Sequence, residues 1–426
     1  MKNVKYEKLR QNKNIQNSHR TITIPKILLI YFIFINFFTI NIFCNDYFEV
    51  WGTGSCYIET KGILVEVTHQ SSPSSTFTSN SMKVYLNLGS FITKVEFKAE
   101  ITDFSHMFED CKTLTSINLA NFDHSVVTTM NSMFKGCSAL KSIQFNNFRQ
   151  THLLINMGSM FQSCSSLITL DLSSFDTSSV LFMNNLFHDC TSLITLDLSH
   201  FNTLKVIKME SMFENCKSLT NLDLDNFYTP SLKQIYNIFS GCSSLTEIKI
   251  SNFDTFQITN FAKIFYNCRS LNQISVTQFI TNMANDMNNM FYNCSKISDL
   301  DLSNFNTEKV VRMNSMFEGC SSLSELRIDN FRVNQVIDME KMFKGCSKLS
   351  NLNLNNFQTN SVINIKEIFS GCLSLTSLDL NSFRTQNVIN MNSMFKDCSS
   401  LKALNIRSFE TSNVLDMSFM FYKCSS

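Results

Sequence analysis

The chain has 426 residues, and its 36 basic side chains nearly balance 35 acidic ones, which leaves a formal net charge of +1 at neutral pH. This balance argues against a nucleic-acid-binding protein, because phosphate recognition requires a basic surface. The length alone suits about two or three globular domains, but the repeats described below predict one elongated body instead.

The first 44 residues differ from the rest of the chain. Residues 1–26 form a polar, basic region, and the segment Ile27–Phe43 that follows is almost continuously apolar. At about 17 residues, this segment exceeds most signal-peptide cores and falls just short of a comfortable membrane span. We therefore interpret residues 27–44 as a cleaved signal peptide, or as an uncleaved signal anchor that attaches the protein to a membrane with its basic end in the cytoplasm. Both interpretations predict an extracellular or cell-surface protein; a buried helix is the alternative.

Residues 45–103 are expected to form a small β-rich N-terminal cap. Apolar side chains follow a strand-like pattern in Ile63–Val67, Val84–Leu88 and Val95–Phe97, and a segment rich in serine and threonine separates the first two. A repeat protein needs such a cap, because a bare terminal coil exposes both its core and a strand edge.

From residue 104 to residue 426 the chain repeats one short unit. Its cysteines are 26 residues apart, as in Cys372, Cys398 and Cys424, with one extra residue between Cys137 and Cys164. A period of about 20–29 residues is typical of leucine-rich repeats, whose single units are too small to bury their own apolar faces. We therefore expect residues 104–426 to form one stack of coils.

The unit Asn387–Phe409 contains two apolar patterns. In its first half, from Val388 to Cys398, apolar side chains recur at the spacing of one helix face. Its second half reads L-x-x-L-x-L followed by Phe409, which is typical of a short strand. The sequence therefore predicts an α/β leucine-rich-repeat solenoid with a parallel β-sheet on one face and short helices on the other.

Phenylalanine and cysteine recur in columns along the stack. Each unit has two phenylalanines, such as Phe395 and Phe409, and stacked coils would align each column into an aromatic spine. The cysteines have no C-x-x-C spacing, and equivalent side chains in neighbouring coils would point the same way. We therefore predict buried free thiols rather than disulfides or metal ligands.

The consensus of the unit is M-x-x-M-F-x-x-C-x-S-L-x-x-L-D-L-S-x-F-x-T-x-x-V, as Asn314–Val336 and Asn392–Val414 illustrate. It resembles the repeat of BspA-like leucine-rich-repeat surface proteins of bacteria and unicellular eukaryotes. The resemblance covers about three quarters of the chain. It implies a non-enzymatic solenoid displayed on the cell surface, with adhesion to host matrix proteins or to other cells suggested for several members. Departures are modest; for example, Ile368 replaces the second methionine and Val333 replaces the loop threonine.

No motif for catalysis, cofactor binding or metal binding is found. The seven histidines are scattered, and none lies in a zinc-protease, nucleophile-elbow or other catalytic pattern. We therefore predict that the protein is not an enzyme, with no catalytic residue, no metal and no cofactor.

The predicted ligand-binding face is the outward side of the sheet. One side chain in each coil must point outward between the two apolar strand residues, and many of these side chains are charged. The residues assigned to this face are Asp171, Asp197, Asp223, Lys249, Asp301, Arg327 and Asp379. The first three aspartates would stack within one screening length, so we expect the face to prefer a basic protein patch or Ca²⁺. Polar residues that only keep the sheet soluble are the alternative.

The function predicted from these patterns is that of a secreted or membrane-anchored binding and adhesion protein, whose suspected partner is a protein of the host matrix or of a cell surface. The chain stops at Ser426, where the next strand is expected, so either the sequence is a fragment or a partner covers the last coil. Two alternatives remain open: a structural surface-coat element that self-associates end to end, and an intracellular leucine-rich-repeat scaffold.

Overall fold

The computed structural model describes residues 47–425, except residues 53, 61–64, 70–75, 80–82, 89–92, 98, 122–123 and 146–147. The predicted basic region and the predicted signal segment Ile27–Phe43 therefore lie outside the described residues. Among the residues that are described, no helix has the length and apolar character needed to cross a bilayer.

Six short strands precede the repeats. They are β1 (Tyr47–Gly52), β2 (Gly54–Glu59), β3 (Val65–His69), β4 (Thr76–Ser79), β5 (Lys83–Leu88) and β6 (Thr93–Phe97). Strands β4, β3, β6 and β1 pair antiparallel in that order, and β2 pairs antiparallel with β5. Every second residue of β6 is buried, as expected for a strand with one face on a core.

The strand β1 connects this sheet to the first coil of the repeats. It pairs antiparallel with β7 (Leu114–Asn118), so the edge of the first coil is hydrogen-bonded to β1. The ring of Phe48 in β1 also meets Phe108 edge to face, with 5.0 Å between ring centroids. The described residues between 47 and 97 thus cover the apolar end of the first coil. The boundary between the N-terminal cap and the solenoid, at residues 103 and 104, stays a prediction.

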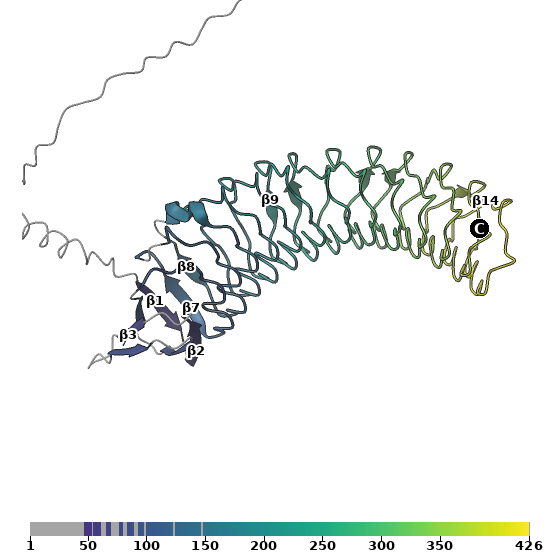
Figure 1. The fold of residues 1–426 in the computed structure, drawn as a ribbon. Helices are drawn as coiled ribbons and strands as arrows, with labels where there is room; N and C mark the ends of the chain where they lie inside the picture. Colours follow the sequence, from purple (N-terminus) through teal and green to yellow (C-terminus); the bar gives the residue numbers. More distant parts are fainter. Residues whose placement is uncertain are drawn as a thin grey trace, which may run out of the picture. The chain divides into compact units, whose positions relative to one another are not determined.

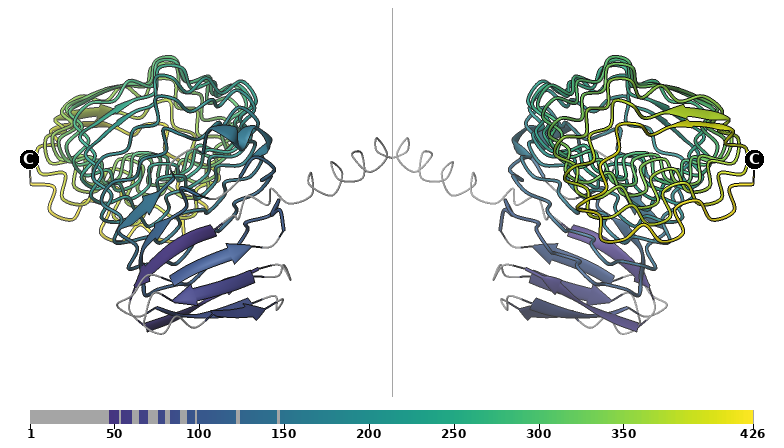
Figure 2. Two further views of the ribbon diagram at one scale, coloured as in Figure 1. Left: turned by 90° about the vertical axis from the view of Figure 1, so that its left-hand side faces the viewer. Right: turned by 90° about the vertical axis from the view of Figure 1, so that its right-hand side faces the viewer.

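The repeats form coils that stack one behind another (Figure 1) and superpose when viewed along the stack (Figure 2). The remaining strands are β8 (Ser142–Gln144), β9 (Asn221–Asp223), β10 (Glu247–Lys249), β11 (Asp299–Asp301), β12 (Glu325–Arg327), β13 (Ser377–Asp379) and β14 (Ala403–Asn405). They pair parallel and in register as β7–β8, β9–β10, β11–β12 and β13–β14. The predicted parallel sheet is therefore present, but gaps interrupt its ladder.

The prediction of short helices on the opposite face is wrong for the part of the chain that the structure describes. There, only the 3-10 helix η1 (Phe148–Leu153) is present, and the segment from the first methionine to the cysteine of each unit is a series of tight turns. In one coil the Met133 N–H donates to the Met130 carbonyl (3.2 Å), whereas the next N–H, of Phe134, donates to the Met160 carbonyl of the following coil (2.8 Å). An α-helix would satisfy both groups within itself. Here alternate groups bind the neighbouring coil.

Positive backbone dihedrals explain why these turns replace a helix. Ser132 and Gly136 have φ of 56° and 77°, and the same two positions are left-handed in most coils. Positive φ at the third residue of a four-residue turn is typical of type II turns. Two such turns in succession place an apolar side chain inward about every third or fourth residue, so they produce the spacing that we interpreted as a helix face.

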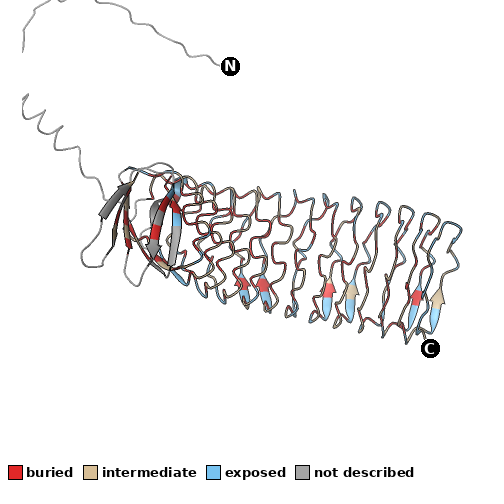
Figure 3. Ribbon diagram, turned by 90° about the horizontal axis from the view of Figure 1, so that it is seen from below, coloured by how far each residue is buried: buried red, intermediate tan, exposed pale blue. Residues whose placement is uncertain are grey.

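One of the two phenylalanine columns forms a continuous aromatic spine, and the other stacks in two runs among the described residues, from Phe201 to Phe253 and from Phe331 to Phe409. In the longer one, rings from Phe108 to Phe421 stack in an unbroken series, with Phe134 and Phe161 5.9 Å apart between centroids and 6° apart in plane angle. Each stacked pair contributes about 0.5–1.5 kcal/mol beyond its area burial. The middle residue of β9, Leu222, is buried between two exposed neighbours, as alternation along a strand requires. Figure 3 shows that several strands of the repeats have both buried and exposed parts.

The cysteine column is buried, as predicted. Every described cysteine from Cys111 to Cys424 is a free thiol. Each thiol from Cys137 onward donates to the carbonyl of a phenylalanine in the preceding coil, as Cys242 does to Phe213 at 3.0 Å. Burial raises the pKa of Cys190, Cys242 and Cys320 to about 12. The column therefore holds neutral thiols that bind one coil to the next.

A third column, of buried threonines, also connects neighbouring coils. The Thr255 hydroxyl donates to the Ile280 carbonyl (3.0 Å) and accepts the Ile280 N–H (2.7 Å). Thr255 is completely buried, so this pair of bonds satisfies backbone groups that water does not reach. The same pair occurs between Thr177 and Asn202.

Replacing Thr255 by valine would keep the shape of the side chain and remove its hydroxyl. The Ile280 N–H and C=O would lose their partner, so we expect the free energy of unfolding to fall by about 1–3 kcal/mol, measured by urea denaturation. Val333 already stands at the threonine position of its own coil, so Val333→Thr is the matched control and is expected to maintain or raise stability. Equal losses in both variants would contradict the proposed role of the hydroxyl.

Stability should fall at alkaline pH because of the cysteine column. An unfolded cysteine ionises near its usual pKa of about 8.5, whereas burial raises the pKa of Cys242 to about 12. The stabilisation is complete below pH 8.5 and is lost as pH rises toward 12, by about 1.4 kcal/mol per pH unit for each such thiol. Urea denaturation at increasing pH should show a shallower fall for Cys242→Ala than for the parent chain; identical slopes would disprove the assignment.

Candidate functional site

The structure places the seven predicted binding residues in one row on the outer side of the sheet. Asp223 and Lys249 end β9 and β10, Asp301 and Arg327 end β11 and β12, and Asp379 ends β13. The remaining two, Asp171 and Asp197, occupy the same place in coils whose backbone forms no strand. All seven are exposed except Asp301, which is partly buried.

The aspartates of this row share a backbone role that the sequence analysis did not anticipate. A carboxylate oxygen of Asp197 accepts the N–H of Ser199, two residues later, at 2.9 Å. Asp171, Asp223, Asp301 and Asp379 accept the corresponding N–H groups at 2.9–3.1 Å. This side-chain-to-backbone bond closes an Asx turn where each strand ends. The recurring D-L-S sequence, with asparagine as its main alternative, is the signal that could have revealed it.

Two of the acids are neutralised by the cations of the next coil. The Lys249 ammonium lies 2.9 Å from a carboxylate oxygen of Asp223, and this hydrogen bond lowers the pKa of Asp223 below its usual range. The Arg327 guanidinium lies 3.0 Å from Asp301, and within 3.8 Å of both Asp299 and Glu325. Asp223 and Asp301 therefore present ion pairs to solvent rather than free negative charge.

Asp171 and Asp197 keep their charge. Neither carboxylate forms an ion pair with a lysine or arginine among the described residues. Hydrogen bonds from Ser173 lower the pKa of Asp171, and hydrogen bonds from Ser199 lower the pKa of Asp197, so both groups are anionic at neutral pH. The predicted stack of three negative aspartates is thus a pair of free carboxylates next to a lysine-bound one.

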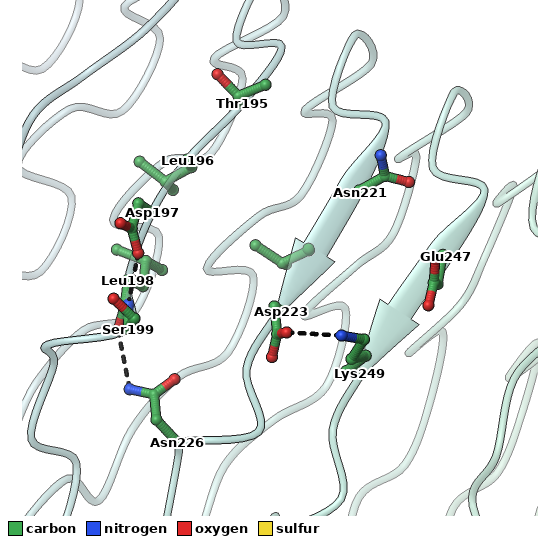
Figure 4. A pocket seen from close by; sticks show the side chains of 11 residues that line it. Thr195, Leu196, Asp197, Leu198, Ser199, Asn221, Asp223, Asn226, Glu247 and Lys249 are labelled. Carbon is green, nitrogen blue, oxygen red and sulfur yellow. Dashed lines mark hydrogen bonds and ion pairs between the residues drawn. The ribbon is translucent and has the colours of Figure 1, made fainter.

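The free carboxylates line hollows that open where the strand ladder is interrupted. Between the coil of Thr195–Ser199 and strands β9 and β10 there is an open hollow of about 710 Å³. A smaller one, of about 270 Å³, lies between the coil of Asp171 and that of Asp197. Figure 4 shows Asp197 on one side of the larger hollow, and the Asp223–Lys249 pair with Glu247 on the other. The larger hollow thus spans one interruption of the ladder and the paired strands β9 and β10.

Exposed apolar side chains precede the same two aspartates in the chain. Ile168 and Ile194 are 51% and 44% exposed, and each comes three residues before its aspartate, Asp171 or Asp197. We call Asp171, Asp197, Ile168 and Ile194 the acidic patch. A surface that combines free carboxylates with exposed aliphatic side chains suits a ligand that carries both lysine or arginine and apolar groups.

A metal ion is a poorer fit to this surface. Among the described residues, no three histidine, cysteine, aspartate or glutamate side chains come close enough together to hold one. One oxygen of each aspartate is also already bound to the backbone. Of the two ligands expected from the sequence, the geometry therefore favours a basic protein patch over Ca²⁺, which takes about six to eight oxygens.

The sequence is similar to one family of known repeats. The family model described as "Mycoplasma protein of unknown function, DUF285" matches residues 79–153, 102–222, 141–248, 208–326, 233–352 and 324–426. These overlapping matches cover the chain from residue 79 to its last residue. No curated protein matches the chain significantly.

Two solved structures are similar at low identity. One is a leucine rich cell surface protein from Faecalibacterium prausnitzii A2-165, at 18% identity, with 75% of this chain and 85% of that chain covered and a TM-score of 0.39. The other is a TLR13–ssRNA13 complex, at 17% identity, with 69% of this chain and 46% of that chain covered and a TM-score of 0.26.

Two variants of Asp197 distinguish its structural role in the Asx turn from the effect of its charge. Asp197→Asn keeps an oxygen that accepts the Ser199 N–H, so we expect the free energy of unfolding to remain unchanged. Asp197→Ala removes this acceptor and should cost about 1 kcal/mol. Urea denaturation of the two variants measures the difference, and an equal loss in both would show that the charge rather than the turn stabilises this position.

Proposed function

Because the chain is a BspA-like repeat protein that belongs to the DUF285 family, we propose that it is a non-enzymatic binding protein that recognises a macromolecular ligand through its sheet face. The ligand is a protein segment that combines basic and apolar side chains, such as an exposed segment of a matrix or cell-surface protein. The observation that supports this assignment is the acidic patch, where two free carboxylates line open hollows and exposed isoleucines stand on the same two coils.

The chemistry of the patch explains the choice of ligand. A lysine or arginine entering the hollow would meet Asp197 on one side and Glu247 on the other, and neither of these has a cation among the described residues within ion-pair distance. Ile168 and Ile194 would contact apolar side chains next to that cation. Such complementarity increases the association rate and the specificity, and its electrostatic part weakens as salt is added.

The location proposed for this activity is outside the cytosol. The proposal is supported by the basic segment of residues 1–26 followed by the apolar segment Ile27–Phe43, a combination typical of secretory signals and signal anchors. The resemblance to BspA-like surface proteins implies the same location. Export would present the sheet face to matrix proteins and to the surfaces of other cells.

Binding by the full-length protein should be screened against immobilised matrix and cell-surface proteins, and the affinity for any ligand found should then be measured. We expect Asp171→Asn combined with Asp197→Asn to weaken binding about tenfold or more, because two unpaired charges that contact the ligand are removed. Added salt should weaken the parent complex more than the variant complex.

Asp301→Asn combined with Asp379→Asn is the matched control. These residues form the same Asx turns on the same face, but Asp301 is bound by Arg327 and Asp379 accepts the Asn405 amide at 2.9 Å. The control should bind as the parent chain does. If removing Asp171 and Asp197 leaves affinity and salt dependence unchanged while the fold remains intact, the acidic patch is not the binding site.

A further inference from the structure

A second exposed apolar surface lies on the loops that follow the strands, away from the hollows of the sheet face. Five large side chains on consecutive coils form it, and we call them the apolar ridge. They are Leu204 (48% exposed), Tyr228 (58%), Phe256 (57%), Ile280 (42%) and Met283 (42%). Neither of the two hollows described above is lined by any of these residues.

Contacts between coils hold the ridge together. Thr203, next to Leu204, donates its hydroxyl to the Tyr228 carbonyl at 2.9 Å. Thr255, next to Phe256, is bound to Ile280 in the same way. The ridge is therefore positioned by the buried threonine column, whose hydroxyls fix each loop against the next. The 3-10 helix η1 takes the place of these loops in an earlier coil. In Figure 1 it lies on the edge of the stack from which small loops project.

The ridge departs from the repeat in a way that packing does not explain. The residue before the loop threonine is Tyr228 or Ile280 in the ridge, but Asp176, Asn306 or Arg384 in other coils. All ridge side chains are at least 42% exposed, so they do not fill the core. Contiguous exposed apolar surface on one side of a soluble repeat is typical of an interaction site.

Lysines surround the ridge. Lys205 lies on its first coil, Lys233 lies on an intermediate coil, and Lys309 lies on the coil that follows the last one; all three are exposed. None of them forms an ion pair within the portion of the chain that the structure describes. The Lys309 ammonium lies 3.4 Å from the Met283 sulfur, so the charge of this exposed lysine is at the edge of the ridge. The acid of these loops, Asp254, is bound to the backbone N–H of Phe256 at 2.9 Å.

We propose that the apolar ridge contacts membranes, inserting its side chains into the headgroup region of a bilayer that contains anionic lipid. Exposed loop tips that carry aromatic and aliphatic residues with lysines beside them have the composition of interfacial membrane anchors. Lysines on both flanks would contact lipid phosphates, and each basic residue near an anionic surface adds to binding. This surface is separate from the acidic patch, so the two proposals can fail independently.

A tryptophan at position 256 tests the proposal in the full-length protein. The emission of Phe256→Trp is recorded with phosphatidylcholine vesicles that contain phosphatidylserine and with vesicles of phosphatidylcholine alone. We expect a blue shift with the anionic vesicles that is smaller with the neutral ones and is reduced by salt. Trp51 is the one native tryptophan and gives the same background in every variant.

Ile363→Trp is the matched control, because Ile363 is 43% exposed in a coil outside the ridge. Insertion of Ile27–Phe43 alone would shift the emission of both tryptophan reporters alike. A larger shift at position 256 than at position 363 therefore requires contact by the ridge. Equal shifts, or no shift at position 256, would overturn the proposal. A shift caused by soluble polyglutamate but not by vesicles would also overturn it, in favour of an acidic protein.

The affinity is tested by replacing Tyr228 and Ile280 together with asparagine in the Phe256→Trp background. Asn306 occupies the corresponding position in the next coil, so the loops accept this residue without loss of fold. We expect the vesicle partition coefficient to fall about tenfold or more, because two apolar side chains no longer enter the bilayer. An unchanged coefficient with unchanged thermal unfolding would disprove the role of the ridge.

Discussion

The structure depends on one constraint: each coil satisfies only part of its own backbone and relies on the next coil for the rest. Alternate N–H groups of the turn segments donate to the following coil, as Phe134 does to Met160. Buried threonine hydroxyls and cysteine thiols meet backbone groups of adjacent coils in the same way. Because a lone coil would leave these groups unpaired, stability arises between neighbours rather than within a unit.

The same constraint determines what the sheet face offers to a ligand. Where strands pair, as in β9 and β10, side chains from adjacent coils come close enough for Lys249 to neutralise Asp223. Where the ladder is interrupted, a hollow opens and Asp197 remains without a cation among the described residues. Each aspartate of the row uses one oxygen to close its turn. The second oxygen is bound by a cation in Asp223 and Asp301 and by no lysine or arginine of the described residues in Asp171 and Asp197. One structural residue of the repeat therefore presents a different charge to solvent in different coils.

Much of this architecture could be predicted from the sequence, because its period, its phenylalanines and its cysteines recur together. The helices were mispredicted, since successive turns with positive φ at Ser132 and Gly136 produce the apolar spacing of a helix face. The row of exposed aspartates was identified correctly, but its pairing was not. Which carboxylates remain free depends on the residue 26 positions later: Lys249 follows Asp223 and Arg327 follows Asp301, whereas another aspartate follows Asp171 and Asp197. This comparison between coils could have been made from the sequence. The interruptions in the ladder could not, because no residue pattern that we analysed distinguishes the coils with paired strands from the others.

The 3-10 helix η1 lies where one unit has an extra residue, and the coils on either side keep their register, with Phe134 stacked on Phe161. A change of length in that loop is thus absorbed locally. A change by one whole unit is accommodated still more easily, because every contact column continues through the new copy. Unequal recombination between the repeated gene segments would therefore yield proteins with more or fewer coils and an intact interior. Such variants would differ in the length of the stack, and so in how much of the outer sheet surface one molecule exposes.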